Sequence, residues 1–461
     1  MQAEVASSAV VRRHISMGRR QLIVGGFAGL AGAAATAAAG CAMPGSTSEK
    51  PLTASGPATA RVLAFNNPLF TNAQNDLVAA LAEVDPQLKP DITIFPGQIN
   101  QFREKAVATY AGGDIPDAQW LHPSITSLMA SRKLLRPLDE LSRKDGETRL
   151  ADFYPGLLDY YRWNGQSYGL NWYSPGYALA YNKALLQRMS VPLPDELERQ
   201  KNWTWDTFGS TLRSLTRGTA GSPDRTIGMQ NETTALDWLC AWLWRNGADV
   251  FSKDSKKVVM NEPAAIEVIQ NVSDLYLKHQ VINYGPHQQD FSEGFLSGRI
   301  GFRQLNKEQA APTRNDLARA TFDLGLAPIY RGKVGRITRL GTLAFGVAQQ
   351  GPNGDAGWRW SRFMAGPRAA AILMSLKSTL PVRPAFAKLP EFQKSMEPWE
   401  NADVWLDSHA TARALAQPAS YNDIATMWTT TWNDVLAQKA PVKSLMDDFT
   451  RQANTLLAQE Q

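Results

Sequence analysis

Strand-like and helix-like segments alternate in the first third of the chain, and this alternation restricts the fold more than any other feature. Strand-like runs occupy residues 61–67, 91–97 and 117–122, and stretches with apolar residues at spacings of three and four separate them. Such alternation predicts an α/β domain with a largely parallel sheet. Ligands of these sheets bind beyond the carboxyl ends of the strands. We therefore expect a candidate site that includes Asn66, Asn67, Trp120 and His122.

The rest of the chain interleaves helical and strand-like segments. Residues 178–335 are rich in helical patterns, and residues 341–347 return to strand-like composition. A further helical stretch covers 354–376, and two amphipathic helices near 421–437 and 441–458 close the chain. This order predicts two lobes joined by more than one crossing of the chain.

The N-terminal segment has the features of an export signal. Four arginines precede an Ala/Gly-rich apolar stretch at 22–39, and Arg19-Arg20 resembles a twin-arginine signal. Residues 38–41, AAGC, resemble a bacterial lipoprotein box in which Cys41 carries the lipid, although Ala38 stands where Leu is preferred. Residues 42–60 are expected to form a flexible tether. The alternative is an uncleaved transmembrane helix, and both interpretations place the body outside the cytoplasm.

Charge and cysteine content exclude several classes of protein. The net charge is +5, but four of the 48 basic and one of the 43 acidic residues belong to 1–41, which leaves a body near +2. The body has no basic cluster longer than a pair, so we expect no nucleic-acid partner. Two cysteines cannot form a disulfide framework, and Cys240 lies in a Trp/Leu-rich helix where we expect a buried thiol.

Catalytic and metal-binding motifs are weak. GQSYG at 165–169 matches a nucleophile-elbow pattern, but Pro175 and Gly176 exclude the helix that must follow Ser167. The four histidines of the body, at 122, 279, 287 and 409, lack metal-ligand spacing. We expect no metal and no cofactor. A glycosidase carboxylate pair separated in sequence stays open, because it leaves no local signature.

Six sequence blocks occur in an order that resembles a known family. They are GGDIPDAQW (112–120), GQSYGLNWYSPGYALAYNKALL (165–186), WTWDTF (203–208), FSEGFLSGRIGF (291–302), LGTLAFGV (340–347) and FMAGPRAAAILMSLKSTLPVRP (363–384). Together they resemble the sugar-type extracellular solute-binding proteins of ABC importers, the class that includes maltose-binding protein. The resemblance implies a two-lobed α/β fold of the type II periplasmic-binding-protein class, with a ligand cleft between the lobes. It places 61–172 and about 341–378 in the first lobe, and 173–340 and about 379–461 in the second.

The resemblance also indicates which residues face the cleft. A sugar presents apolar C–H faces and a rim of hydroxyls, so its site needs aromatic platforms with polar neighbours. Fourteen tryptophans make such platforms available, and most are expected to be core residues. Besides the four residues named above, the expected ligand contacts are Asn171, Trp172, Tyr173, Trp238, Arg303, Asn306, Gly341, Thr342, Arg383 and Tyr421.

The resemblance implies a monomeric, lipid-anchored protein that binds a carbohydrate or polyol and delivers it to the permease subunits of an ABC importer, without catalysis. One alternative is a secreted carbohydrate-active enzyme, such as a glycosidase or lyase. A second is a lipoprotein sensor that reports its ligand to a partner. A third is a transporter component for a glycerophosphodiester, with Arg303 or Arg383 binding the phosphate.

Overall fold

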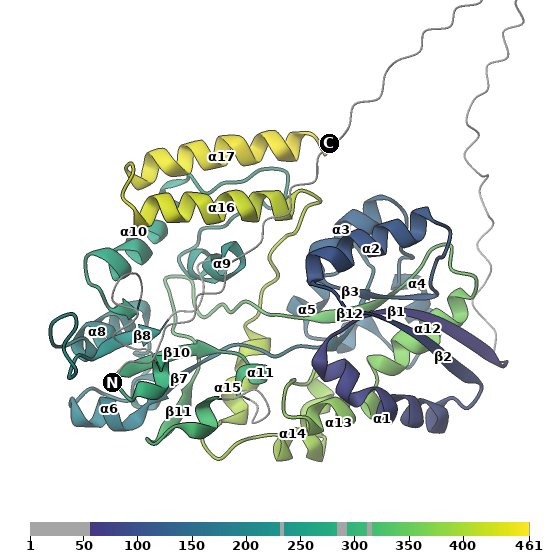
Figure 1. Ribbon diagram of the computed structural model, residues 1–461, viewed down its shortest axis with the longest axis horizontal. Helices are drawn as coiled ribbons and strands as arrows, with labels where there is room; N and C mark the ends of the chain where they lie inside the picture. Colours follow the sequence, from purple (N-terminus) through teal and green to yellow (C-terminus); the bar gives the residue numbers. More distant parts are fainter. Residues whose placement is uncertain (1–55, 231–234, 284–292, 311–315, 461) are drawn as a thin grey trace, which may run out of the picture. The chain divides into compact units, whose positions relative to one another are not determined.

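The computed structural model describes residues 56–230, 235–283, 293–310 and 316–460. The expected export signal, the lipidation site at Cys41 and most of the tether lie outside these residues. Two five-stranded sheets and one short hairpin organise the described chain (Figure 1). We call each large sheet, with the helices packed on it, the first lobe and the second lobe.

The first sheet has the strand order β2-β1-β3-β12-β6. β1 pairs in parallel with both β2 and β3, whereas β12 runs antiparallel to its neighbours β3 and β6. The three strands expected from the alternation, β1, β2 and β3, are therefore parallel as expected, whereas the sheet as a whole is mixed. The strands are β1 (Ala58–Phe65), β2 (Leu88–Phe95), β3 (Ala118–Leu121), β6 (Leu170–Tyr173) and β12 (Leu343–Val347).

The second sheet has the order β11-β7-β10-β8-β9. β8 is parallel to β9 and β10, whereas β7 is antiparallel to β10 and β11. Its strands are β7 (Ala178–Asn182), β8 (Ile227–Gln230), β9 (Ile282–Asn283), β10 (Ile300–Leu305) and β11 (Leu324–Ala327), and the separate hairpin consists of β4 (Arg162–Trp163) and β5 (Gln166–Ser167).

Helices occupy most of the remaining described chain. The α-helices before β8 are α1 (Pro68–Val84), α2 (Ile99–Ala111), α3 (Pro123–Ser131), α4 (Asp139–Asp145), α5 (Pro155–Asp159), α6 (Lys183–Arg188), α7 (Pro194–Arg199) and α8 (Trp205–Leu215). Those after β8 are α9 (Leu236–Arg245), α10 (Pro263–Leu277), α11 (Lys307–Ala310), α12 (Gly354–Met364), α13 (Pro367–Ser375), α14 (Pro390–Lys394), α15 (Ala402–Ala410), α16 (Tyr421–Leu436) and α17 (Val442–Ala458). Single 3₁₀ turns are η1 (Leu150–Asp152), η3 (Gly294–Ser297), η4 (Asp316–Arg319) and η5 (Pro384–Lys388).

Helix α1 shows how local sequence positions the edge of the first sheet. The Asn67 side chain, at the end of β1, accepts hydrogen bonds from the backbone N–H groups of Leu69 (3.0 Å) and Phe70 (3.3 Å). Pro68 follows at the first helical position, where its missing N–H costs nothing. The turn from strand to helix is therefore determined within four residues.

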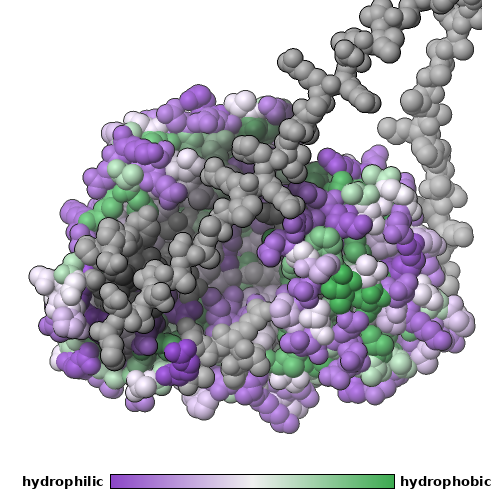
Figure 2. Space-filling view, viewed as in Figure 1, coloured by the Kyte–Doolittle hydropathy of each residue, from purple (hydrophilic) through white to green (hydrophobic). Residues whose placement is uncertain are grey.

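Helices pack on both sheets and enclose the apolar residues. α12 packs on all five strands of the first sheet and α1 packs on α13, while Figure 1 shows α2 and α3 on the opposite side of that sheet. In the second lobe α8 covers β8 and β10, and α9, α10, α16 and α17 pack on one another. Hydrophilic residues cover most of the face seen in Figure 2, with hydrophobic residues in smaller patches. No helix in the described ranges has the length and apolar character that crossing a membrane requires.

The segments that connect the two lobes are hydrogen-bonded to one another around Ser174. Its backbone N–H and C=O both meet the Thr379 hydroxyl at 3.1 Å, which joins the β6–β7 connection to the segment after α13. Its own hydroxyl lies 3.0 Å from the Gly341 carbonyl oxygen, in the β11–β12 connection, and 2.9 Å from His409 Nε2. Gly176 has a φ of +58°, and a Cβ there would lie 2.5 Å from Leu380 Cδ1.

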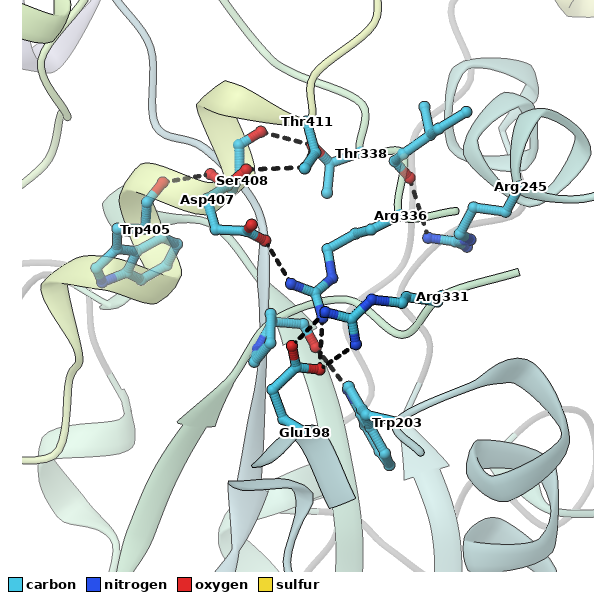
Figure 3. A network of polar contacts seen from close by, with 12 residues as sticks. Glu198, Trp203, Arg245, Arg331, Arg336, Thr338, Trp405, Asp407, Ser408 and Thr411 are labelled. Atoms are coloured by element: carbon cyan, nitrogen blue, oxygen red, sulfur yellow. Dashed lines mark hydrogen bonds and ion pairs between the residues drawn. The ribbon is translucent and has the colours of Figure 1, made fainter. Parts of the chain in front are cut away.

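A second network holds the β11–β12 connection against the second lobe (Figure 3). The Arg331 guanidinium donates to both Glu198 carboxylate oxygens (2.8 and 2.5 Å). Arg336 donates to the same carboxylate at 2.6 Å and to Asp407 at 2.9 Å. Burial alone would raise the pKa of Glu198, but these two guanidinium groups hold it below its ordinary value. The network thus holds the β11–β12 connection between Glu198 of α7 and Asp407 of α15.

We predict that the stability of this region depends on His409. The ring is 1% exposed, and burial lowers its pKa to about 4, although a hydrogen bond to the Pro381 carbonyl opposes the shift. The unfolded chain takes up a proton near pH 6.5 that the folded chain does not accept. The stabilisation is therefore complete above pH 6.5 and is lost as the pH falls toward 4, by about 3 kcal/mol.

Urea unfolding of the protein and of the His409→Gln variant between pH 7 and 4.5 measures this contribution. The variant should lose less stability than the native protein over the same pH interval. An identical pH dependence in both proteins would contradict the prediction.

Candidate functional site

A buried arginine packs against two aromatic rings near the lobe connections. The Cζ atom of Arg339 lies 4.2 Å from the ring centroid of Tyr177 and 4.4 Å from that of Trp238. The two rings meet edge to face at 5.1 Å. The same guanidinium donates to the Tyr177 hydroxyl and to the Asp237 carboxylate. We call these four residues the Arg339 cluster.

The cluster is formed by segments far apart in sequence. Tyr177 belongs to the β6–β7 connection, Arg339 to the β11–β12 connection, and Asp237 and Trp238 to the first turn of α9. Burial disfavours the Arg339 cation, but Asp237, with smaller contributions from Tyr177, Tyr160 and Cys240, raises the pKa of Arg339 above its ordinary value. Arg339 is 6% exposed, whereas the Asp237 side chain is 37% exposed and Trp238 is partly exposed. The cluster therefore turns a carboxylate and an aromatic ring outward.

Three further titratable groups lie in the electrostatic range of this cluster. Burial lowers the pKa of His122 to about 4, with opposing contributions from Asp237 and from Arg339. His122 Nδ1 accepts from the backbone N–H of Ser124 at 3.2 Å, so the ring is neutral at pH 7 and caps α3. Burial also raises the pKa of Tyr160 and of Tyr421, and the negative charge of Asp237 raises both pKa values further. These side chains are therefore uncharged hydrogen-bonding groups at neutral pH.

A groove opens between the lobes next to the cluster, with a volume of about 800 Å³. Arg103 and Leu128, from α2 and α3, line its first-lobe wall. Asp237 and Tyr421 line its second-lobe wall, at the starts of α9 and α16. Volumes of this size are typical of small-molecule sites. Asp237 thus belongs both to the Arg339 cluster and to the groove, and Tyr421 is an expected contact that the structure places there.

Two of the expected aromatic platforms lie in the core of the first lobe instead. Trp120 is 1% exposed and packs at 5.2 Å against both Phe65 and Phe102. Trp172 is 2% exposed and packs against Phe70 (5.9 Å) and Phe345 (6.0 Å). Both strands are covered on their two faces, so neither ring presents a face to solvent.

The neighbours of Trp172 are also engaged in internal contacts. The Asn171 amide donates to the Leu157 carbonyl and to the Thr342 hydroxyl, which in turn donates to the Tyr173 carbonyl at 2.9 Å. The Tyr173 hydroxyl donates to Glu308 at 2.7 Å and so links β6 to α11. Gly341 accepts from Ser174 through its carbonyl. These expected contacts therefore hold the lobe connections together in this structure.

The remaining expected contacts differ in exposure. Asn66 is exposed at the end of β1, whereas the Asn67 side chain caps α1 as described above. Asn306 exchanges hydrogen bonds with Gln309 at the start of α11, and Arg303 is partly buried in β10. The Arg383 guanidinium lies 4.4 Å from the Phe153 ring, is 6% exposed and packs in the core.

The residues that sequence reasoning missed are Tyr177, Asp237 and Arg339. Arg339 directly precedes the block LGTLAFGV (340–347), and Asp237 directly precedes Trp238. The partners of Arg339 are 162 and 102 residues away along the chain, so no local sequence signal indicates the cluster.

Ser167, Cys240 and the candidate metal-binding side chains are the remaining features that the sequence raised. Ser167 lies in β5 and leads into β6 rather than into a helix, so the nucleophile-elbow geometry is absent at this position. Cys240 is a buried free thiol, as expected, and burial raises its pKa. Within the described ranges, no group of three or more His, Cys, Asp or Glu side chains is arranged to hold a metal ion.

Comparison with known proteins identifies related folds. Residues 77–398, more than half of the chain, match the family model of the bacterial extracellular solute-binding proteins. The sugar-binding protein MalE of Xanthomonas citri has a TM-score of 0.74 and 17% identity, over 87% of this chain and 98% of that protein. A cyclic α-maltosyl-1,6-maltose binding protein of Arthrobacter globiformis has 0.71 and 20%, over 87% and 99%.

UgpB of Mycobacterium tuberculosis, in complex with glycerophosphocholine, has a TM-score of 0.68 and 18% identity, over 88% of this chain and 99% of that protein. Comparison with curated protein sequences finds no match. The fold is the two-lobed α/β fold of type II periplasmic binding proteins, as expected. The exact boundaries of the lobes stay a prediction.

Two tryptophan substitutions test the assignment of core and site. Trp172→Ala removes a fully buried ring and should lower the free energy of unfolding by about 3–5 kcal/mol. Trp238→Ala removes a partly exposed ring and should cost only about 1 kcal/mol. Urea denaturation measures both, and equal losses of stability would contradict the placement of these rings.

Proposed function

Because the chain belongs to the bacterial extracellular solute-binding protein family, we propose that it binds a carbohydrate outside the cytoplasmic membrane. The ligand is an oligosaccharide or a related polyol, and the protein delivers it to the permease subunits of an ABC importer. The mechanism is closure of the two lobes over the ligand, which shifts an open–closed equilibrium by its differential affinity for the two states. No reaction is catalysed.

The observation that carries this proposal is the Arg339 cluster beside the groove. Arg339 packs over the partly exposed Trp238 ring, and we propose that the remaining exposed surface of this ring contacts the C–H groups of a sugar. The Asp237 carboxylate, which lines the groove, accepts hydrogen bonds from the sugar hydroxyls in this proposal. The cation of Arg339 holds both in place and neutralises Asp237. A rigid aromatic surface next to a fixed acceptor matches the two kinds of surface that a sugar presents.

The first-lobe wall and α16 supply the remaining proposed contacts. Neutral His122, the exposed Asn66 and the Tyr421 hydroxyl add hydrogen-bonding groups without net charge. The names of several structural neighbours agree with this chemistry, since they include proteins that bind maltose-type sugars.

A glycerophosphodiester is the second candidate ligand, because UgpB with glycerophosphocholine has the same fold. A phosphate needs an unpaired guanidinium, however, and Arg339 is already paired with Asp237. Of the two arginines expected to bind a phosphate, Arg383 packs against Phe153 in the core and Arg303 is partly buried in β10. The cluster therefore favours an uncharged ligand.

The remaining parts of the proposal concern the N-terminal segment and the assembly. Membership of this family places the mature protein outside the cytoplasm. We propose that a twin-arginine signal directs export and that Cys41 carries the lipid anchor, with residues 42–60 as the tether. The protein acts as a monomer at the membrane surface.

A thermal-shift screen tests the ligand class. Purified protein is heated with maltose, maltotriose, raffinose and glycerophosphocholine in separate samples. An oligosaccharide at one hundred times its Kd should stabilise the protein by about 2.7 kcal/mol through mass action. Arg339→Gln and Trp238→Ala should abolish this shift, because they remove the cation and the platform.

Trp399→Ala is the matched control, since it removes another partly buried tryptophan outside the cluster and should keep the shift. Stabilisation by glycerophosphocholine alone, or by none of the sugars, would refute the carbohydrate assignment. Release of a cleaved product from any of the sugars would indicate an enzyme instead.

A further inference from the structure

A separate pocket lies within the second lobe, with a volume of about 490 Å³. Its walls come from the first turn of α8, the last turns of α9, the middle of α10 and the segment 330–333. None of the residues of the Arg339 cluster or of the interlobe groove lines it. Its volume is within the range of small-molecule sites.

Three aromatic rings form the apolar wall of this pocket. Trp205 meets Trp242 edge to face at 5.2 Å and lies 5.6 Å from Tyr330. Trp242 and Tyr330 meet at 5.9 Å. Both tryptophans are partly exposed, whereas the neighbouring Trp203 and Trp244 are fully buried. The pocket thus leaves solvent-accessible indole surface that a ligand can cover.

The bases that line the pocket already have partners. Arg331 is bound to Glu198, as Figure 3 shows, and Lys333 donates to both carboxylate oxygens of Glu267 at 2.7 and 2.9 Å. The Arg245 guanidinium stacks on Tyr330 at 4.4 Å and donates to its hydroxyl at 3.1 Å. A charged ligand would have to compete with these pairs, so the pocket favours a neutral one.

Short polar side chains also line this pocket. Asp206, Asn246 and Asn271 line the pocket, and Asp206 and Asn271 are exposed. The Asp206 carboxylate accepts hydrogen bonds from hydroxyls, and the Asn246 and Asn271 amides can both donate and accept them. The pocket therefore combines aromatic surface with polar groups, which complements the apolar C–H face and the hydroxyl groups of a pyranose ring.

We propose that this pocket is a second carbohydrate site, which binds one hexopyranose unit of an oligosaccharide on the second lobe, away from the interlobe groove. The identity of the ligand class rests on the proposed function. The ring stacks on Trp205 and Trp242, and its hydroxyls bind Asn246, Asn271 and Asp206. The protein then binds sugar at two sites, one in this pocket on the second lobe and one in the interlobe groove.

Fluorine NMR of the protein labelled with 5-fluorotryptophan tests this site separately from the groove. Single Trp→Phe substitutions assign the resonances of Trp205, Trp242 and Trp238, and the other resonances report that each variant is folded. Maltose, cellobiose and lactose are titrated to millimolar concentration. At least one sugar should shift the Trp205 and Trp242 resonances with saturation, also in the Trp238→Ala variant.

Substitution of Trp205 measures how much its aromatic ring contributes to the affinity for sugar. Trp205→Ala should weaken the affinity reported by Trp242 by roughly tenfold or more, as expected for a central aromatic contact. Trp205→Phe should retain part of it, and the control Trp399→Phe should leave it unchanged.

The two reporters distinguish the possible failures. A shift of Trp238 alone would overturn the second site and leave the proposed function intact. A shift of Trp205 and Trp242 without Trp238 would support the second site and count against the groove. No shift with any of the three sugars would overturn both.

Discussion

The three connections between the lobes are held by hydrogen bonds that meet at Ser174, and the rest of the structure depends on this junction. The Thr379 hydroxyl, the Gly341 carbonyl and the His409 ring all bond to this one residue. Because Ser174 has a single hydroxyl hydrogen, it can donate to Gly341 or to His409 but not to both at once. The junction therefore fixes where the lobes meet while leaving a choice between two hydrogen bonds.

The same connections carry two residues of the candidate site, Tyr177 and Arg339. Tyr177 lies three residues after Ser174, and Arg339 lies two residues before Gly341, so the junction determines the positions of both. Trp238 and Asp237 then complete the cluster from α9. Two of the four cluster residues, Tyr177 and Arg339, belong to the connections and contact Asp237 and Trp238, so the proposed ligand would be coupled to the junction through them.

Much of the fold could be predicted from the sequence because its signals are local. The alternation of strands and helices, the termination of β1 and the start of α1 follow from patterns within a few residues, and the structure confirms the α/β fold with β1, β2 and β3 parallel in a mixed first sheet. Asn67 and His122 were correctly placed at strand ends, where they cap helices. The ordered sequence blocks indicated the family, which the family model confirms.

The site was less predictable because it depends on contacts between distant segments. In β6 both faces are buried, so alternation could not tell whether Trp172 faces the core or a ligand. Arg339 becomes meaningful only when Tyr177 and Asp237 are brought to it. The central claim is that a sugar binds against the Arg339 cluster, and a crystal structure of the protein with a stabilising oligosaccharide tests it most directly. We predict a sugar ring stacked on Trp238 with a hydroxyl bound to Asp237, whereas a bound sugar that leaves the cluster uncontacted would contradict the account.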